Sequence, residues 1–190
     1  MDERNLMNEL PIERSYWAVP GRLLAGAFPG DPDEAKTLRR IRAFLETGIR
    51  TFVNLMQPDE VNHHGHPFRP YDRVVETEAR AMGVGARCLR FPIVDLSIPD
   101  LATMDAIRAA LDEAHRSGAP AYVHCWGGKG RTGQVVGVHL IEHGHATHAD
   151  FVETIARLRQ RDPGGGRSPE TPEQIEFVRR YAEARGLGSA

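Results

Sequence analysis

The sequence predicts a single α/β domain with a central, mostly parallel sheet of about five strands flanked by helices. Its length of 190 residues suits one domain with a sizeable core. Short apolar runs of strand length alternate along the chain with longer segments whose apolar residues recur at helical spacing. No internal repeat or low-complexity segment interrupts this alternation.

The chain begins with a polar segment that precedes the first strand. Residues 1–14 are expected to form a loose arm, which leaves residues 15–187 as the domain. Strands are predicted at 15–19 and 22–26, because two β-prone runs surround a Pro20-Gly21 turn.

A helix and a third strand come next. Either Asp31 or Asp33 can cap the helix, whose apolar residues recur every three or four positions and which ends at Gly48. The apolar run from Ile49 to Leu55 has the length of a short buried strand.

The middle of the chain supplies a loop, a helix, a strand and a further helix. The loop covers residues 56–70, and the helix after it covers about 71–82. A strand is predicted at 88–92, and apolar residues at helical spacing predict a helix over 100–117.

The last part of the chain is mostly helical. A strand at 121–123 leads through a glycine-rich stretch into an apolar helix that includes residues 135–141. Two more helices are predicted at about 147–160 and 171–185, separated by the Pro/Gly-rich residues 163–166. We expect the helices after the glycine-rich stretch to pack on one face of the sheet.

The glycine-rich stretch carries the chemistry. It contains Cys125, then five residues of which three are glycines, then Arg131 and Thr132. A loop between a strand and a helix N-terminus binds anions, because free N–H groups and the helix dipole point into it. We expect Cys125 to be a thiolate near neutral pH in such a loop, and Arg131 can grip two oxygens of a phosphate. The pattern therefore predicts attack of sulfur on phosphorus; the alternative is a buried cysteine before an ordinary turn.

The expected phosphate-binding residues are the loop amides and the arginine. These are Trp126, Gly127, Gly128, Lys129, Gly130 and Arg131.

Hydrolysis of a phosphate ester also needs a proton donor for the leaving oxygen. Asp95 lies 30 residues before Cys125, between a predicted strand and a predicted helix. Asp95 could instead be a turn former. Asp100 is expected to cap the helix that follows, although it could be a second acid.

Several of these residues resemble the signature His-Cys-x5-Arg-Ser/Thr of the cysteine-dependent protein tyrosine phosphatases. His124, Cys125, Arg131 and Thr132 match it position by position, and Asp95 matches the acid-bearing stretch of dual-specificity phosphatases. The order of acid and loop, and the stretches 19–26 and 54–60, are similar to small enzymes of the cyclin-dependent-kinase-associated kind.

The resemblance implies a protein tyrosine phosphatase-like fold and a phosphocysteine intermediate. It also implies that His124 orders the loop, that Thr132 hydrogen-bonds the sulfur and that Gln174 positions the hydrolytic water. The run Gly-Lys-Gly-Arg-Thr, which contains Lys129, resembles the corresponding run of phosphoinositide and inositol-phosphate phosphatases. Lys129 would then add positive charge above the cradle; alternatively, its side chain simply points into solvent. Trp126 could line the pocket rim or pack beneath the loop.

Composition limits the other functional classes. The 24 Lys and Arg against 26 Asp and Glu give a net charge of −2, so nucleic acid is not an expected partner. No apolar run is long enough for a membrane span, and the N-terminus lacks the apolar core of a signal peptide. Two cysteines do not make a disulfide framework, so a reducing cytoplasm is the expected location.

No cofactor or metal is expected. Three histidines in the 56–70 loop (His63, His64 and His66) have no carboxylate or cysteine at ligand spacing. His139 and His143 fit a zinc pair on a helix but also fit ordinary packing. Cys88 could oxidise with Cys125 as a redox brake, although the sequence alone does not place the two sulfurs together.

The sequence therefore predicts a metal-independent phosphomonoester hydrolase whose substrate is a phosphorylated protein or small molecule. Two alternatives stay open at this point. One is a phosphoinositide or inositol-phosphate phosphatase, and the other is a non-catalytic module that binds phosphate with the same loop.

Overall fold

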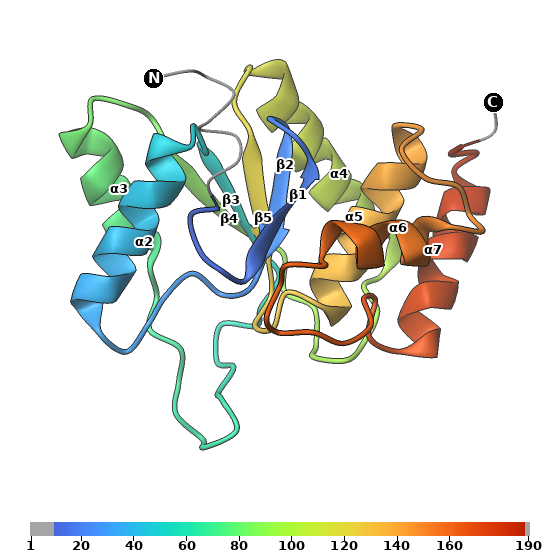
Figure 1. The fold of residues 1–190 in the computed structure, drawn as a ribbon, viewed down its shortest axis with the longest axis horizontal. Helices are drawn as coiled ribbons and strands as arrows, with labels where there is room; N and C mark the ends of the chain where they lie inside the picture. Colours follow the sequence, from blue (N-terminus) through green and yellow to red (C-terminus); the bar gives the residue numbers. More distant parts are fainter. Residues whose placement is uncertain (1–9, 189–190) are drawn as a thin grey trace.

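The computed structural model describes residues 10–188, which form one five-stranded sheet with helices on both faces (Figure 1). The strand order is β1-β2-β5-β3-β4, in which β1 runs antiparallel to β2 and all other neighbours are parallel. The predicted α/β class and mostly parallel sheet are thus confirmed. The strands are β1 (Ser15–Val19), β2 (Leu23–Gly26), β3 (Thr51–Asn54), β4 (Arg87–Arg90) and β5 (Ala121–His124).

The helices divide between the two faces of the sheet. Buried side chains of α2 (Glu34–Glu46) and α3 (Asp72–Ala81) form one apolar cluster against one face. The other face is covered by α4 (Leu101–Arg116), α5 (Gly130–Glu142), α6 (Phe151–Leu158) and α7 (Pro172–Ala184). The helices that follow the glycine-rich stretch therefore share one face, as the sequence predicts.

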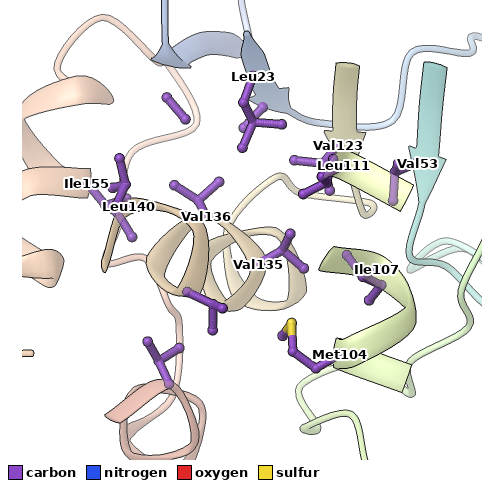
Figure 2. Packing of buried hydrophobic residues seen from close by; sticks show 14 of the residues in the cluster. Leu23, Val53, Met104, Ile107, Leu111, Val123, Val135, Val136, Leu140 and Ile155 are labelled. Atoms are coloured by element: carbon purple, nitrogen blue, oxygen red, sulfur yellow. The ribbon is translucent and has the colours of Figure 1, made fainter. Parts of the chain in front are cut away.

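Strand β5 is the centre of the fold. Its side chains alternate between the two apolar clusters, with Val123 in the α4–α7 cluster and Tyr122 in the α2–α3 cluster, as the two-residue period of a strand requires. Figure 2 shows Val123 beside Val53 and Leu111, with Val135 of α5 packed below. Burial on both faces explains why this strand is a continuous apolar run.

Local chemistry sets where the helices begin. Asp33, rather than Asp31, caps α2, with its side chain accepting from the amide of Ala35 at 2.9 Å. Asp100 caps α4 in the same way. Helix α7 begins with a capping box, in which Thr171 and Gln174 satisfy each other's amides.

The segment before β1 is packed against the domain from residue 10 onward. Leu10 and Ile12 are half-buried against the α2–α3 cluster, and Arg14 donates a hydrogen bond to the carbonyl of Gly127 at 2.8 Å. The expectation of a loose arm therefore fails for residues 10–14, because two half-buried apolar side chains and one hydrogen bond hold them. Residues 1–9 lie outside the described residues.

The parallel strands end level with one another. His124 pairs with Gly26 on one side and with Asn54 on the other, and Asn54 pairs with Arg90. The loops that follow these strands therefore converge at one edge of the sheet, the lower edge in Figure 1. Cys125 is the first residue beyond β5 at that edge, which is where open parallel sheets bind ligands.

Candidate active site

A tight loop joins β5 to α5 and follows Cys125. Gly128 lies in the left-handed region with φ of 70°, and a Cβ there would come within 2.4 Å of the Gly26 carbonyl carbon. Only glycine fits that position. A Cβ on Gly130 would lie 3.0 Å from the side chains of Gln174 and Glu170, so the loop is enclosed by the segment before α7.

The carbonyl groups of this loop are held outward by donors from elsewhere in the chain. A carbonyl and the following N–H point in opposite directions within one trans peptide plane. Each carbonyl held outward therefore turns the next amide inward, which builds an anion cradle. The four pairs are Cys125 with His124 Nδ1 (3.1 Å), Trp126 with the Phe28 amide (3.0 Å), Gly127 with Arg14 Nη2 (2.8 Å) and Lys129 with Ser168 Oγ (2.9 Å).

His124 lies beneath the cradle as a neutral imidazole. Its Nδ1 must carry the proton, because the Cys125 carbonyl can only accept. Its Nε2 then accepts from the hydroxyl of Tyr71 at 2.5 Å. Complete burial lowers the pKa of His124 to about 3, so the ring does not charge at neutral pH. His124 therefore joins Tyr71 to the first carbonyl of the loop.

Cys125 is nearly buried, with 3% of its surface exposed. The hydroxyl of Thr132 donates to its sulfur at 3.1 Å. This contact brings together two of the predicted site residues at the start of α5.

Arg131 lies beside them and is only 1% exposed. Glu60 accepts from Nη1 and Nη2 at 2.6 and 2.8 Å, and Asp95 lies 2.8 Å from Nη2. Burial acts to lower the pKa of Arg131, but the Glu60 hydrogen bonds and the nearby Cys125 and Asp95 raise it on balance. The Nε atom of the same guanidinium is buried and has no partner in residues 10–188.

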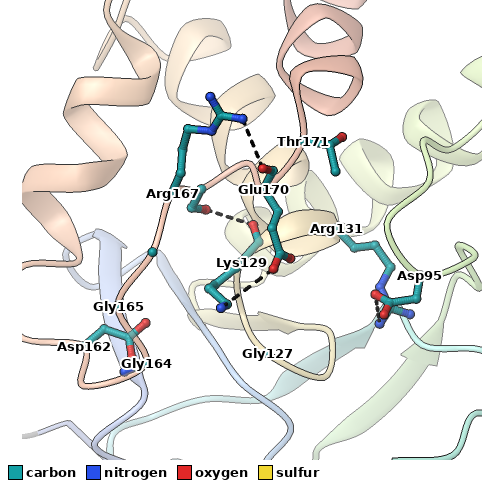
Figure 3. A network of polar contacts seen from close by, with 12 residues as sticks. Asp95, Gly127, Lys129, Arg131, Asp162, Gly164, Gly165, Arg167, Glu170 and Thr171 are labelled. Atoms are coloured by element: carbon teal, nitrogen blue, oxygen red, sulfur yellow. Dashed lines mark hydrogen bonds and ion pairs between the residues drawn. The ribbon is translucent and has the colours of Figure 1, made fainter. Parts of the chain in front are cut away.

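Asp95 and Asp100 have separate positions, which distinguishes the two candidate acids. Asp95 is half exposed and points at Arg131 (Figure 3). Asp100 caps α4, where hydrogen bonds from Thr103 lower the pKa of its carboxyl. A carboxyl held ionised in a cap suits a structural role better than proton donation.

Two predicted residues have positions that the sequence left open. Gln174 is fully buried, and its Oε1 accepts from the amides of Glu170 and Thr171. Its Nε2 donates to Ser97, so both ends of the amide anchor loops. A role of Gln174 in positioning the hydrolytic water stays a prediction. Lys129 lies 3.7 Å from Glu170 (Figure 3) and is neither free in solvent nor tightly paired.

Trp126 packs beside the cradle against the loop between β3 and α3. Its ring lies 5.4 Å from Phe68 and 4.3 Å from His63. These side chains, with His64 and His66, line a cavity of about 630 Å³. The histidine-rich loop is therefore a wall beside the site.

The remaining candidates do not form sites among the described residues. No group of three histidine, cysteine or acidic side chains between residues 10 and 188 could hold a metal ion. The rings of His139 and His143 lie 4.1 Å apart and are tilted by 33° to each other on α5. Cys88 lies on the α2–α3 face, whereas Cys125 belongs to the opposite cluster. With β3 between their strands, the two thiols are too far apart for a disulfide.

Glu60 is the residue that sequence reasoning missed. It lies in the loop after β3, and its carboxylate accepts hydrogen bonds from both Nη atoms of Arg131. Its place in the stretch 54–60, which resembles small dual-specificity phosphatases, was the available indication.

Known proteins with similar sequences point to one family. Residues 12–175 match the family model described as "PTP-SAK: Swiss Army Knife protein, DSP-PTPase phosphatase domain". The mouse protein tyrosine phosphatase domain-containing protein 1 is 27% identical over 169 residues, which cover 89% of this chain and 21% of that protein.

A plant relative is more distant. An Arabidopsis thaliana phosphatidylinositol 3,4,5-trisphosphate 3-phosphatase and protein-tyrosine-phosphatase, PTEN1, is 23% identical over 184 residues, covering 95% of this chain and 40% of that protein. The chain spans about a fifth of the length of the mouse relative and less than half of the plant one.

Solved structures share the fold. Tk-PTP in its active form has a TM-score of 0.65 at 23% identity, covering 90% of this chain and 97% of that one. Kinase associated phosphatase has a TM-score of 0.64 at 16% identity, covering 91% and 94%. PTPMT1 in complex with PI(5)P also has a TM-score of 0.64, at 20% identity, covering 88% and 96%. With the family match over residues 12–175, the chain belongs to the Swiss Army Knife family of dual-specificity-type, cysteine-dependent protein tyrosine phosphatase domains.

Proposed function

We propose that this domain hydrolyses phosphomonoesters without a metal, through a phosphocysteine formed on Cys125. The observation that carries this proposal is the convergence of three groups on one point. The Cys125 sulfur contacts Thr132, the neighbouring Arg131 offers a buried guanidinium, and Asp95 reaches the same guanidinium from another loop.

The arginine has a free edge for phosphate. Glu60 takes the Nη1–Nη2 end of the guanidinium, while the other edge carries the unpartnered Nε and the Nη2 that contacts the half-exposed Asp95. A phosphate dianion can accept from Nε and Nη2 together once Asp95 moves aside. The inward amides of the loop would bind its remaining oxygens as they gain charge.

The chemistry then proceeds in two steps. The Cys125 thiolate attacks phosphorus, the ester P–O bond breaks, and Asp95 gives its proton to the leaving oxygen. Water next attacks the phosphocysteine, Asp95 takes a proton from that water, and the S–P bond breaks to release phosphate. Thr132 stabilises the departing thiolate by the hydrogen bond that it already makes.

Phosphorylated protein is the substrate class that we propose first. Lys129 supports the alternative of a phosphoinositide or inositol phosphate, because it belongs to the loop and its ammonium has only a loose contact, with Glu170 at 3.7 Å. The names of the plant relative and of the PTPMT1 complex point the same way. The need to keep Cys125 reduced favours the cytoplasm; no described helix could cross a bilayer.

The test is turnover of 4-nitrophenyl phosphate in the presence of a metal chelator. We expect hydrolysis by the unmodified chain and none by Cys125→Ser, which should still bind phosphate because the amides and Arg131 remain. Wild-type-like hydrolysis by that variant would contradict the mechanism. Phosphate binding without any turnover by the unmodified chain would indicate a binding module. A panel of phosphopeptides, phosphoinositides and inositol phosphates then separates the substrate classes.

A further inference from the structure

The carbonyl oxygen of Ser97, two residues after Asp95, accepts two hydrogen bonds from glutamine side chains. Gln134 Nε2 lies 3.0 Å away and Gln174 Nε2 lies 3.1 Å away. Both glutamines are fully buried. A carbonyl oxygen only accepts, so both amide nitrogens must face it, and its two lone pairs are filled.

The two donors come from different helices. Gln134 lies on α5, about one turn after Arg131. Gln174 lies in the first turn of α7, where the capping box fixes its side chain. The helix that carries the phosphate-binding arginine therefore also holds the loop that carries the acid. This common support fixes the spacing between Arg131 and Asp95.

The acid sits on a strained turn that needs such support. The amide of Ser97 donates to the carbonyl of Val94 at 3.1 Å, which closes a turn over Asp95 and Leu96. Leu96 has φ of 59° and is exposed. A leucine is unfavourable in this region of backbone conformation and persists there only where the surroundings hold it. Burial of Leu96 does not hold this conformation, which leaves the contacts of its two neighbours, from Asp95 to Arg131 and from the Ser97 carbonyl to the two glutamines, as the nearest anchors.

Packing alone does not explain why a glutamine stands at position 134 of α5. Its Oε1 atom is buried without a partner in the described part of the chain, and an apolar side chain of similar length would avoid that cost. Within residues 10–188, the one hydrogen bond of its side chain is the donation to Ser97.

We propose that Gln134 is a positioning residue for the general acid. Together with Gln174 it clamps the turn, so that the backbone of Asp95 stays at the mouth of the cradle when phosphate takes the place of its carboxylate on Arg131. This inference rests on the proposed phosphatase function.

The variant Gln134→Met removes the donor and the orphaned acceptor while keeping the volume. With phenyl phosphate, whose leaving group needs a proton, kcat/KM should fall about two- to tenfold, the effect of losing one neutral hydrogen bond. With 4-nitrophenyl phosphate it should change much less, and the melting temperature should be unchanged or higher. Gln160→Met, at the exposed end of α6, is the matched control and should change neither rate.

A double-mutant cycle separates positioning from a general structural role. In an Asp95→Asn background, Gln134→Met should have no further effect on phenyl phosphate, because the group it positions has gone. An equal loss in both backgrounds, or an equal loss with both esters, would overturn the inference. Unchanged rates with phenyl phosphate would overturn it as well.

Amide hydrogen exchange tests the clamp independently of turnover. In Gln134→Met, the Ser97 amide should exchange about two- to tenfold faster, whereas the Ile93 amide, bonded to Leu55 at 3.0 Å, should not change. If the unmodified chain hydrolyses neither ester, the proposed function is wrong. Exchange of the Ser97 amide would still show whether Gln134 holds the turn. Equal exchange of the Ser97 amide in both proteins would rule the clamp out.

Discussion

Replacement of Asp95 by asparagine should change catalysis and phosphate binding in opposite directions. The carboxyl is the proposed proton donor, and such a group contributes roughly 10²–10⁴-fold to the rate. Hydrolysis of phenyl phosphate should therefore slow by a factor in that range. Hydrolysis of 4-nitrophenyl phosphate should slow much less, since its phenolate leaves without a proton.

The same substitution should tighten the binding of inorganic phosphate. Asp95 lies 2.8 Å from Arg131 Nη2 and competes with phosphate for that donor. Because its side chain is 50% exposed, the ion pair is worth about 0.5–1 kcal/mol after solvent screening. Removal of its charge should lower the competitive inhibition constant of phosphate about two- to fivefold.

The assay compares kcat/KM for the two esters and the inhibition constant of phosphate in Asp95→Asn. The matched control is Asp100→Asn, which alters the same loop at the cap of α4 and should lose a little stability and little rate. Equal slowing of both esters would refute Asp95 as the proton donor. Unchanged or weaker phosphate binding would refute the competition for Arg131. Loss of rate only in Asp100→Asn would move the acid to that residue.

Three further predictions concern buried side chains that are charged or can become charged. Arg131→Lys should abolish most activity, because an ammonium cannot replace a planar fork on phosphate; a loss in kcat/KM below about threefold, or ~0.7 kcal/mol, would contradict this. Glu60→Gln should lower the free energy of unfolding by about 3 kcal/mol, since it removes one partner of a buried ion pair. Millimolar phosphate should restore part of the melting temperature that Glu60→Gln loses. If Glu60→Gln melts at the same temperature as the unmodified chain without phosphate, the ion pair of Glu60 with Arg131 does not stabilise the fold. Stability should fall between pH 6.5 and 3, because burial lowers the pKa of His139 to about 3, so that only the unfolded chain takes up its proton there. Urea unfolding at pH 7.5 and 5 should show a drop that His139→Leu reduces by about 2 kcal/mol, and an equal drop in both proteins would contradict it.

The fold could be predicted from the sequence because its local patterns agree with its packing. Strand β5 has a run of non-charged, largely apolar residues from Ala121 to Val123 because it is buried on both faces, and Asp100 stands directly before the apolar period of α4. The exception is residues 10–14, because the charged and polar residues of the whole 1–14 segment hid the packing of Leu10 and Ile12. Two apolar residues in a polar segment carry no periodicity from which to infer burial.

The site was predictable where its residues adjoin one another in sequence and not where they meet only in space. Cys125, Arg131 and Thr132 lie in one loop and the turn after it, so their spacing alone indicates an anion site. Glu60 reaches Arg131 from a loop that has no regular structure to predict it from. Gln134 had one indication, because it is an amide in an otherwise apolar stretch of α5.

The contact from Arg14 to the Gly127 carbonyl affects where this domain can be cut. A fragment that begins at β1 would keep every strand and helix, yet it would release one of the four carbonyls that are held outward. The peptide unit between Gly127 and Gly128 would then be free to rotate, and its N–H could leave the cradle. Fusions, deletions and domain exchanges made at the start of the sheet would therefore preserve folding while weakening the anion site, so the boundary belongs before residue 10.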